Sequence, residues 1–262
     1  MKFSWLTMGF AALAMVSGVM LGTAASAAAA DKPLTVLTDP SFVPFEMKDN
    51  ESGKMVGFDM DMLREIAKRA GFDYNLKTMN FEGIIPALQA RQADMAIAGI
   101  TITDARSKVV DFSDPYYDSG LQLLVPVDNG SITKISDLKG KAVGTKIGST
   151  SSIFLKKNAP ESTKITPYPS GSNMFMALLS GSVDAVLYDQ PNVAYFAQTK
   201  GKGKVKTVGK LYEGQSYGIA LKKGSEWLPK VNKALADIKA DGTYDKIYEK
   251  WFGKAPEKNG KS

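Results

Sequence analysis

The chain has 262 residues, 44% of them hydrophobic and 23% charged, which is typical of folded proteins and sufficient for one large domain or two of ordinary size. It contains no cysteine and no histidine, which excludes disulfides, thiolate nucleophiles, Ser-His-Asp chemistry and zinc sites that need imidazole or thiolate. We expect neither a cofactor nor a metal site. The net charge of +6 does not indicate nucleic-acid binding, because the lysines are scattered among acidic residues and form no basic block with interleaved aromatics.

The first thirty residues have the pattern of a secretory signal peptide. Lys2 lies in a charged start, an apolar run extends from Trp5 to about Leu21, and residues 25–27 form an Ala-x-Ala cleavage pattern. We expect a signal peptide over 1–27, with cleavage there or as late as residue 30. A membrane anchor is the alternative, but the run contains three glycines and no basic stop-transfer cluster follows it. The mature protein is therefore expected to be exported and soluble.

Short apolar runs alternate with amphipathic stretches from Leu34 onward, which indicates an α/β fold with mostly parallel strands. The first set is expected, in order, as a strand at 34–38, a turn-rich stretch through 54, a helix at 58–70 ending at Gly71, a strand at 74–79, a helix at 83–91 and a strand at 95–100. Pro86 is expected within the first turn of its helix, where its missing N–H costs little.

Turn residues and aromatics at 111–120 interrupt this rhythm, and a second alternating set follows. It begins with a strand at 121–127, which is followed by two segments at 135–140 and 141–145 and by a helix after 148–152. Three further segments of the alternating set lie at 173–181, 183–188 and 191–201. Another turn-rich crossing toward Tyr217 leads to a strand at 217–224 and to two helices separated by Asp241-Gly242.

The two interruptions predict two lobes joined by two crossings, with one lobe built from discontinuous segments. The expected boundaries are 31–115 plus 218–262 for lobe 1, 120–213 for lobe 2, and 116–119 and 214–217 for the hinge crossings. The interface of two lobes is a favoured place for a small-molecule site.

The stretch AGITITDARSKVVDFSDPYY (98–117) groups residues that suit an anion. Gly99 and Thr101 lie at the end of a buried strand, a helix begins at Thr103-Asp104, and Arg106 lies in its first turns. A guanidinium grips a carboxylate with two bonds, and strand-end amides beside a helix N-terminus favour negative charge, so an α-carboxylate suits this site. The alternative is that Arg106 pairs with Asp104 or Asp111 on the surface.

Five motifs in order carry a resemblance to a known family: TDPSFVPFE (38–46), VGFDMDML (56–63), MNFEGIIPAL (79–88), AGITIT (98–103) and AVLYDQPN (185–192). Over about 34–253 the chain resembles the periplasmic amino-acid-binding proteins of ABC importers, solute-binding protein family 3, and most of all their glutamine-binding members. The resemblance implies a two-lobe hinged receptor with the type II periplasmic-binding-protein fold. It also implies a monomer in the periplasm that binds an L-amino acid, serves a membrane permease and is not an enzyme.

The family's ligand contacts carry over by position. Arg106, with the Thr101 backbone, matches the α-carboxylate clamp, and Asp189, with the Gly99 carbonyl and Thr101, matches the α-ammonium site. Phe42 and Phe81 match two aromatics that sandwich the aliphatic stem of the ligand. The alternatives are that Asp189 caps the helix before Pro191 and that the two aromatics belong to the core.

Recognition of the ligand side chain is expected from Asp39, Lys146, Thr150 and Tyr188. Lys146 disfavours a cationic ligand, whereas Asp39 and Lys146 together offer an acceptor and a donor to a neutral amide, which favours glutamine. Tyr188 and Thr150 depart from the glutamine-binding pattern, which has an imidazole and a glycine there, and both add bulk. Asparagine, glutamate or a broader polar range therefore stays open, and arginine is a further alternative ligand.

Two functions of other classes are possible on the same fold. An enzyme on the same fold would remove water or carboxylate from a small acid, but no acidic residue beyond Asp39 and Asp189 matches the site. A sensing lobe would pass closure to a signalling partner, but no transmembrane span or signalling domain follows Ser262 in the sequence.

Overall fold

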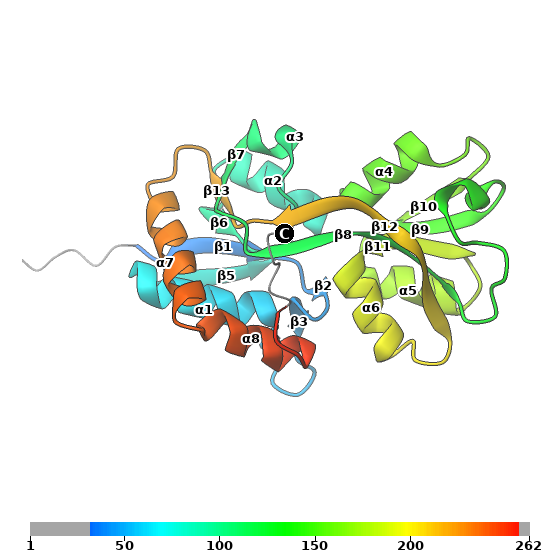
Figure 1. Cartoon of the computed structure of the whole chain (residues 1–262). Helices are drawn as coiled ribbons and strands as arrows, with labels where there is room; N and C mark the ends of the chain where they lie inside the picture. Colours follow the sequence, from blue (N-terminus) through cyan, green and yellow to red (C-terminus); the bar gives the residue numbers. More distant parts are fainter. Residues whose placement is uncertain (1–31, 257–262) are drawn as a thin grey trace, which may run out of the picture. The chain divides into compact units, whose positions relative to one another are not determined.

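The computed structural model describes residues 32–256 (Figure 1). The predicted signal peptide lies outside this range. Within it, no helix combines the length and the apolar character needed to cross a membrane.

Lobe 1 is built on a mixed five-stranded sheet in which β1 pairs in parallel with β5 and β6, while β13 runs antiparallel to β6 and β7. In spatial order its strands are β5 (Tyr74–Thr78), β1 (Leu34–Thr38), β6 (Met95–Ala96), β13 (Ala220–Lys222) and β7 (Val110–Phe112). Its helices are α1 (Phe58–Ala70), α2 (Phe81–Gln89), α3 (Asp104–Ser107), α7 (Leu228–Ala240) and α8 (Thr243–Phe252). The late strand β13 lies between β6 and β7, so this sheet is built from two separate parts of the chain.

Lobe 2 is built on a second mixed sheet, in which β9 runs parallel to β10 and β11, and β8 runs antiparallel to β11 and β12. In spatial order its strands are β10 (Lys164–Tyr168), β9 (Ala142–Lys146), β11 (Ala185–Asp189), β8 (Tyr117–Pro126) and β12 (Val205–Tyr217). Its helices are α4 (Thr150–Asn158), α5 (Gly171–Leu179), α6 (Gln190–Gln198) and the short 3₁₀ helix η1 (Ile135–Leu138). The two sheets confirm the predicted α/β two-lobe class.

The two connections between the sheets are extended strands and not the turns that the sequence suggested. Figure 1 shows β8 and β12 crossing side by side, and their pairing continues to Tyr117 opposite Tyr217. The two tyrosine rings stack with centroids 5.7 Å apart, and the Phe45 ring packs edge-on against both. Aromatic packing of this kind stabilises an extended backbone in segments whose polar residues had predicted turns.

Two other features differ from the expectation. The turn-rich stretch before α1 contains a small antiparallel sheet of β2 (Ser41–Phe42), β3 (Glu46–Lys48) and β4 (Met55–Val56), whose strands are too short to show an alternating pattern. Helix α2 begins at Phe81, so Pro86 lies inside the helix and the prediction that it belongs to the first turn is wrong. At this position Pro86 supplies no N–H to the carbonyl four residues earlier.

The direction of the strands places candidate site residues at one edge of each sheet. Asp39 follows β1 and Gly99 lies shortly after β6, while Lys146 and Asp189 are the last residues of β9 and β11. The carboxyl ends of parallel strands share an edge, so these residues meet where the two lobes face each other.

Candidate functional site

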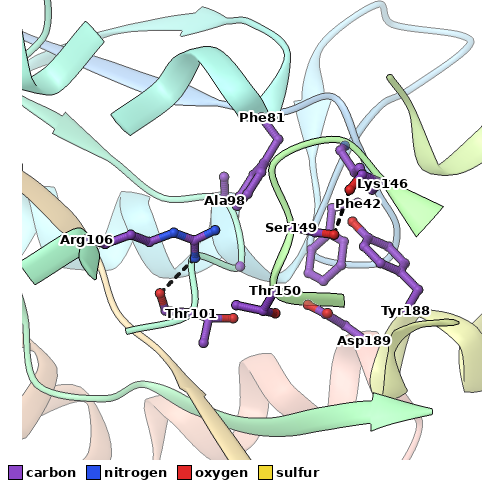
Figure 2. A pocket seen from close by; sticks show the side chains of 11 residues that line it. Phe42, Phe81, Ala98, Thr101, Arg106, Lys146, Ser149, Thr150, Tyr188 and Asp189 are labelled. Atoms are coloured by element: carbon purple, nitrogen blue, oxygen red, sulfur yellow. Dashed lines mark hydrogen bonds between the residues drawn. The ribbon is translucent and has the colours of Figure 1, made fainter. Parts of the chain in front are cut away.

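A cavity lies between the lobes, and Figure 2 shows the side chains that point into it. The residues that line it are Phe42, Phe81, Ala98, Gly99, Thr101, Arg106, Lys146, Ser149, Thr150, Tyr188 and Asp189. Nine of the ten residues predicted as ligand contacts are in this lining. The tenth, Asp39, is not in the lining and contacts Lys146 instead.

Arg106 is held at the cavity by a short capped helix. The Thr103 side chain accepts a hydrogen bond from the Arg106 N–H and so begins α3, as predicted. The guanidinium donates to the Thr101 carbonyl in lobe 1 at 2.9 Å and to the Gly148 carbonyl in lobe 2 at 3.0 Å, and it lies over the Phe81 ring. Within residues 32–256 it forms no salt bridge, so the alternative pairing with Asp104 or Asp111 is absent there.

The N-terminus of α4 faces the same part of the cavity. Ser149 caps this helix by accepting a hydrogen bond from the Ser152 N–H, and Thr150 is its first residue. The first N–H groups of a helix have no intrahelical partner and favour an anion. Lobe 1 therefore contributes a guanidinium and lobe 2 a helix N-terminus to one end of the cavity.

Asp189 supplies the negative charge on the side of lobe 2. The Tyr217 hydroxyl donates to its Oδ2 at 2.7 Å, while its Oδ1 is buried and receives no hydrogen bond from the described residues. Burial raises the pKa of Asp189 to about 6, although the Tyr217 hydroxyl, Arg106 and Lys146 act in the opposite direction. Asp189 is the N-cap residue of α6, yet its side chain forms no capping hydrogen bond, so the alternative of a purely capping role is not seen.

Asp39 and Lys146 form a buried ion pair across the cleft. Lys146 Nζ lies 2.5 Å from Asp39 Oδ2 and 2.8 Å from Ser41 Oγ, and both charged side chains are at most 2% exposed. The remaining bonds to Asp39 come from the backbone and hydroxyl of Ser41 and from the Phe81 N–H. Both oxygens of Asp39 are thus engaged, whereas Lys146 has a third N–H to donate.

Gly99 shapes the floor of the cavity in a way that only glycine allows. Its φ is +52°, and a Cβ at this position would lie 2.3 Å from the Phe42 ring. The Gly99 N–H donates to the buried Asp59 at 2.9 Å, and Tyr116 donates to the same oxygen. Asp59 thus fixes the backbone whose carbonyl was predicted to face the ligand.

Asp59 lies against a second buried carboxyl group, that of Glu46. Burial raises the pKa of Asp59 to about 6, and burial together with the Asp59 charge raises the pKa of Glu46 well above its usual value. Burial thus favours the neutral form of Glu46, and neither of its buried carboxyl oxygens has a hydrogen-bond partner among the described residues. The sequence analysis placed position 59 in the helix expected at 58–70 and gave it no role at the site.

Sequence reasoning also missed Gln215, Ser41 and Ser149. The Gln215 side-chain oxygen accepts hydrogen bonds from Thr101 in lobe 1 and from Thr150 in lobe 2, at 3.2 and 3.0 Å. No sequence signal marks a lone glutamine in a crossing strand. The Ser-rich run 149–152, by contrast, carries the signature of a helix start and identifies Ser149 as a capping candidate.

The cavity lining thus combines two cations, Arg106 and Lys146, with one anion, Asp189, and Asp39 pairs with Lys146 outside the lining. Such a site suits a zwitterion, because each charged end of the ligand meets an opposite charge in a poorly hydrated space. No cluster of three or more potential metal-ligating acidic residues occurs in the range 32–256.

Comparison with protein families gives one match that spans the described fold. The model of the bacterial extracellular solute-binding proteins, family 3, matches residues 34–254.

Individual relatives differ in their ligands. The chain is 33% identical over 253 residues to the L-cystine-binding protein TcyJ of Escherichia coli K12, covering 94% of both chains. It is 32% identical over 249 residues to the histidine-binding periplasmic protein of Salmonella typhimurium, covering 92% of this chain and 95% of that one. Among solved structures, an ancestral arginine-binding protein bound to glutamine is 48% identical, with a TM-score of 0.80, covering 85% of this chain and 98% of that one. The same kind of ancestral protein is also known bound to arginine.

The contact between Tyr217 and Asp189 can be tested by titration. Tyr217→Phe removes the hydroxyl that stabilises the ionised carboxylate, so we expect the pKa of Asp189 to rise above about 6. Carbon NMR of the labelled aspartate side chains measures this shift directly. Tyr244→Phe, which removes a hydroxyl bonded to the Tyr116 carbonyl, is the control and should leave it unchanged. An Asp189 pKa that is equal or lower in Tyr217→Phe would contradict the assignment.

Proposed function

Because the chain belongs to family 3 of the bacterial extracellular solute-binding proteins, we propose that it captures L-glutamine in the periplasm and delivers it to the permease of an ABC importer. The coarser part of this function follows from the family and the relatives: the chain is an amino-acid-binding protein of ABC transport and not an enzyme. The choice of ligand, the residues that bind it and the periplasmic location are the parts that we propose.

The observation that carries the proposal is the unmatched charge at the cavity. Asp189 Oδ1 is buried with no donor from the described residues, and a buried carboxylate without a full set of donors is costly. An α-ammonium group would supply that donor, with the Gly99 carbonyl and the Thr101 hydroxyl as its other acceptors. The α-carboxylate would then lie between Arg106 and the N-terminus of α4.

Lys146 supports a neutral ligand side chain. Its ammonium lines the cavity, so the side chain of an arginine or lysine ligand would meet a like charge where little water screens it. The third N–H of Lys146 can donate to an amide carbonyl, and the hydroxyls of Thr150 and Tyr188 add partners for an amide. A related ancestral protein has been solved with glutamine bound, which is consistent with this choice.

Arginine is the second candidate, because the ancestral arginine-binding protein, at 48% identity, also binds arginine. A guanidinium ligand would have to displace Lys146 from Asp39 and take its place against the carboxylate. The choice between glutamine and arginine thus depends on the stability of the Asp39–Lys146 pair.

The same contacts explain why a ligand would favour closure. Asp39–Lys146 and Arg106–Gly148 both join lobe 1 to lobe 2, so the lobes are in direct contact around the cavity. A ligand shifts a hinge equilibrium only through its differential affinity for the closed state. A zwitterion held by Arg106 from lobe 1 and Asp189 from lobe 2 has that differential affinity.

Isothermal titration of residues 31–262 against the twenty L-amino acids tests the proposal. We expect glutamine to bind most tightly and Arg106→Lys to weaken it by about thirtyfold or more, because an ammonium cannot reproduce the planar two-bond grip of a guanidinium. Arg91→Lys, a change at an exposed arginine outside the cavity, is the control. If no amino acid binds, or if Arg106→Lys binds as the wild type does, the proposed site is wrong.

The pH dependence of affinity follows from Asp189. Its raised pKa of about 6 means that it is ionised at pH 7.5 and largely protonated at pH 5, and only the ionised form pairs with an ammonium. We therefore expect binding at pH 5 to be about tenfold weaker than at pH 7.5. Asp59 titrates in the same range, so Tyr217→Phe serves as the discriminating variant: the midpoint should move upward in it. A midpoint that does not move would assign the effect to another group.

Selectivity tests the role of Lys146. Lys146→Leu removes the like charge that a cationic ligand meets and leaves Asp39 without its cation, so the affinity of arginine relative to glutamine should rise by tenfold or more, about 1.4 kcal/mol. Lys139→Leu, at an exposed position of lobe 2, should leave the ratio unchanged. An unchanged or falling ratio in Lys146→Leu would show that Lys146 does not select the ligand side chain.

A further inference from the structure

The charges of this protein are divided unequally between its lobes. Residues 120–213, which form lobe 2, contain twelve lysines and no arginine against six acidic residues. The rest of the described chain, 32–119 and 214–256, contains eighteen basic and nineteen acidic residues. The lysines that look scattered along the sequence are thus an excess of positive charge that belongs to lobe 2 alone.

This excess is not neutralised by ion pairs. Eight salt bridges occur among the described residues: seven lie within lobe 1, and the eighth is the pair of Lys146 with Asp39 across the cleft. No lysine of lobe 2 other than Lys146 takes part in one. Their charges therefore add to a field that extends into solvent over about a Debye length.

The fold gathers these lysines at the end of lobe 2 opposite the cavity. Strands β9 and β11 end at the cavity, so their first residues lie at the distal end of the sheet. Strand β10, which is parallel to β9, also begins there, and β12 begins there because it is paired with the end of β8. Helices α4 and α6 start at the cavity and end distally, and Figure 1 shows the chain turning back there between α6 and β12. The distal lysines are Lys134, Lys139, Lys141, Lys156, Lys157, Lys164, Lys200, Lys202, Lys204 and Lys206.

Their chemical character indicates the kind of partner. Only four acidic residues lie in the same connections, and two of these, Asp137 and Asp184, accept hydrogen bonds from backbone N–H groups. The distal end has no arginine, although arginine and large aromatics dominate the energetics of protein–protein interfaces. A diffuse set of lysines, eight of the ten exposed and Lys141 and Lys206 half-buried, instead suits the many mobile phosphate groups of an anionic membrane surface, where each lysine contributes independently.

We propose that the distal lysines of lobe 2 form a docking surface for an anionic lipid bilayer. Docking through this end leaves the cavity, at the opposite edge of the same sheet, accessible to solute. It would raise the concentration of the receptor near the membrane that holds a permease; that benefit rests on the proposed function, whereas the binding itself does not.

Co-sedimentation with lipid vesicles tests the proposal without any amino acid present. Residues 31–262 are mixed with vesicles of phosphatidylcholine containing about 30% phosphatidylglycerol, or of phosphatidylcholine alone. We expect binding to the anionic vesicles at about 25 mM salt, loss of binding at about 300 mM salt, and none to the neutral vesicles.

Charge reversal locates the surface. Lys200→Glu, Lys202→Glu and Lys204→Glu together should weaken vesicle binding at least about thirtyfold. The matched control reverses Lys68, Lys77 and Lys246, which are exposed lysines of lobe 1, and should weaken it less than about threefold. Unchanged circular dichroism and amino-acid affinity verify folding, and the same three positions changed to glutamine serve if the first variant is unstable.

Several outcomes would overturn the proposal. They are the absence of binding to anionic vesicles at low salt, equal binding to neutral vesicles, or an equal loss in the two charge-reversal variants. Binding to poly-L-glutamate without binding to vesicles would also overturn it and would indicate an acidic polypeptide as the partner.

Discussion

The structure depends on burying charges of both signs between two lobes. Asp39 of lobe 1 and Lys146 of lobe 2 neutralise each other at 2.5 Å, while Arg106 and Asp189 approach the same cavity without pairing directly. Taking a charge out of water is costly unless partners surround it, so four such groups in one place need both lobes and a ligand of matching charge. The proposed closure of the lobes and the proposed binding of a zwitterion thus follow from one electrostatic constraint.

A second layer of residues keeps this cavity in shape. Asp59 holds the Gly99 backbone beside the buried Glu46, whose raised pKa favours its neutral form, and Tyr217 holds Asp189 from the strand that links the sheets. Because Tyr217 also stacks on Tyr117 of the other linking strand, the crossing strands and the proposed ammonium site share one side chain. A change in lobe orientation is therefore coupled to the environment of Asp189.

The sequence alone predicted the features that follow from hydrophobic periodicity or from a local motif. The periodicity of the chain indicated most helices and strands, and the motif around Arg106 identified a capped helix at the end of a strand. It did not predict the small sheet before α1 or the strand character of the crossings, because these segments are stabilised by aromatic contacts between distant residues. Nor could it predict the bonds of Gln215 or the pairing of Asp39 with Lys146, 107 positions apart, since such contacts exist only after both lobes have folded.

The central claim is that a zwitterion completes the charges of the cavity, and a crystal structure of residues 31–262 with L-glutamine tests it most directly. The account predicts the α-ammonium nitrogen within about 3 Å of Asp189 Oδ1 and the Gly99 carbonyl, and the α-carboxylate paired with the Arg106 guanidinium. It also predicts that the ligand amide accepts a hydrogen bond from Lys146. A ligand bound in the reverse orientation, or one that leaves Asp189 Oδ1 without a donor, would contradict it.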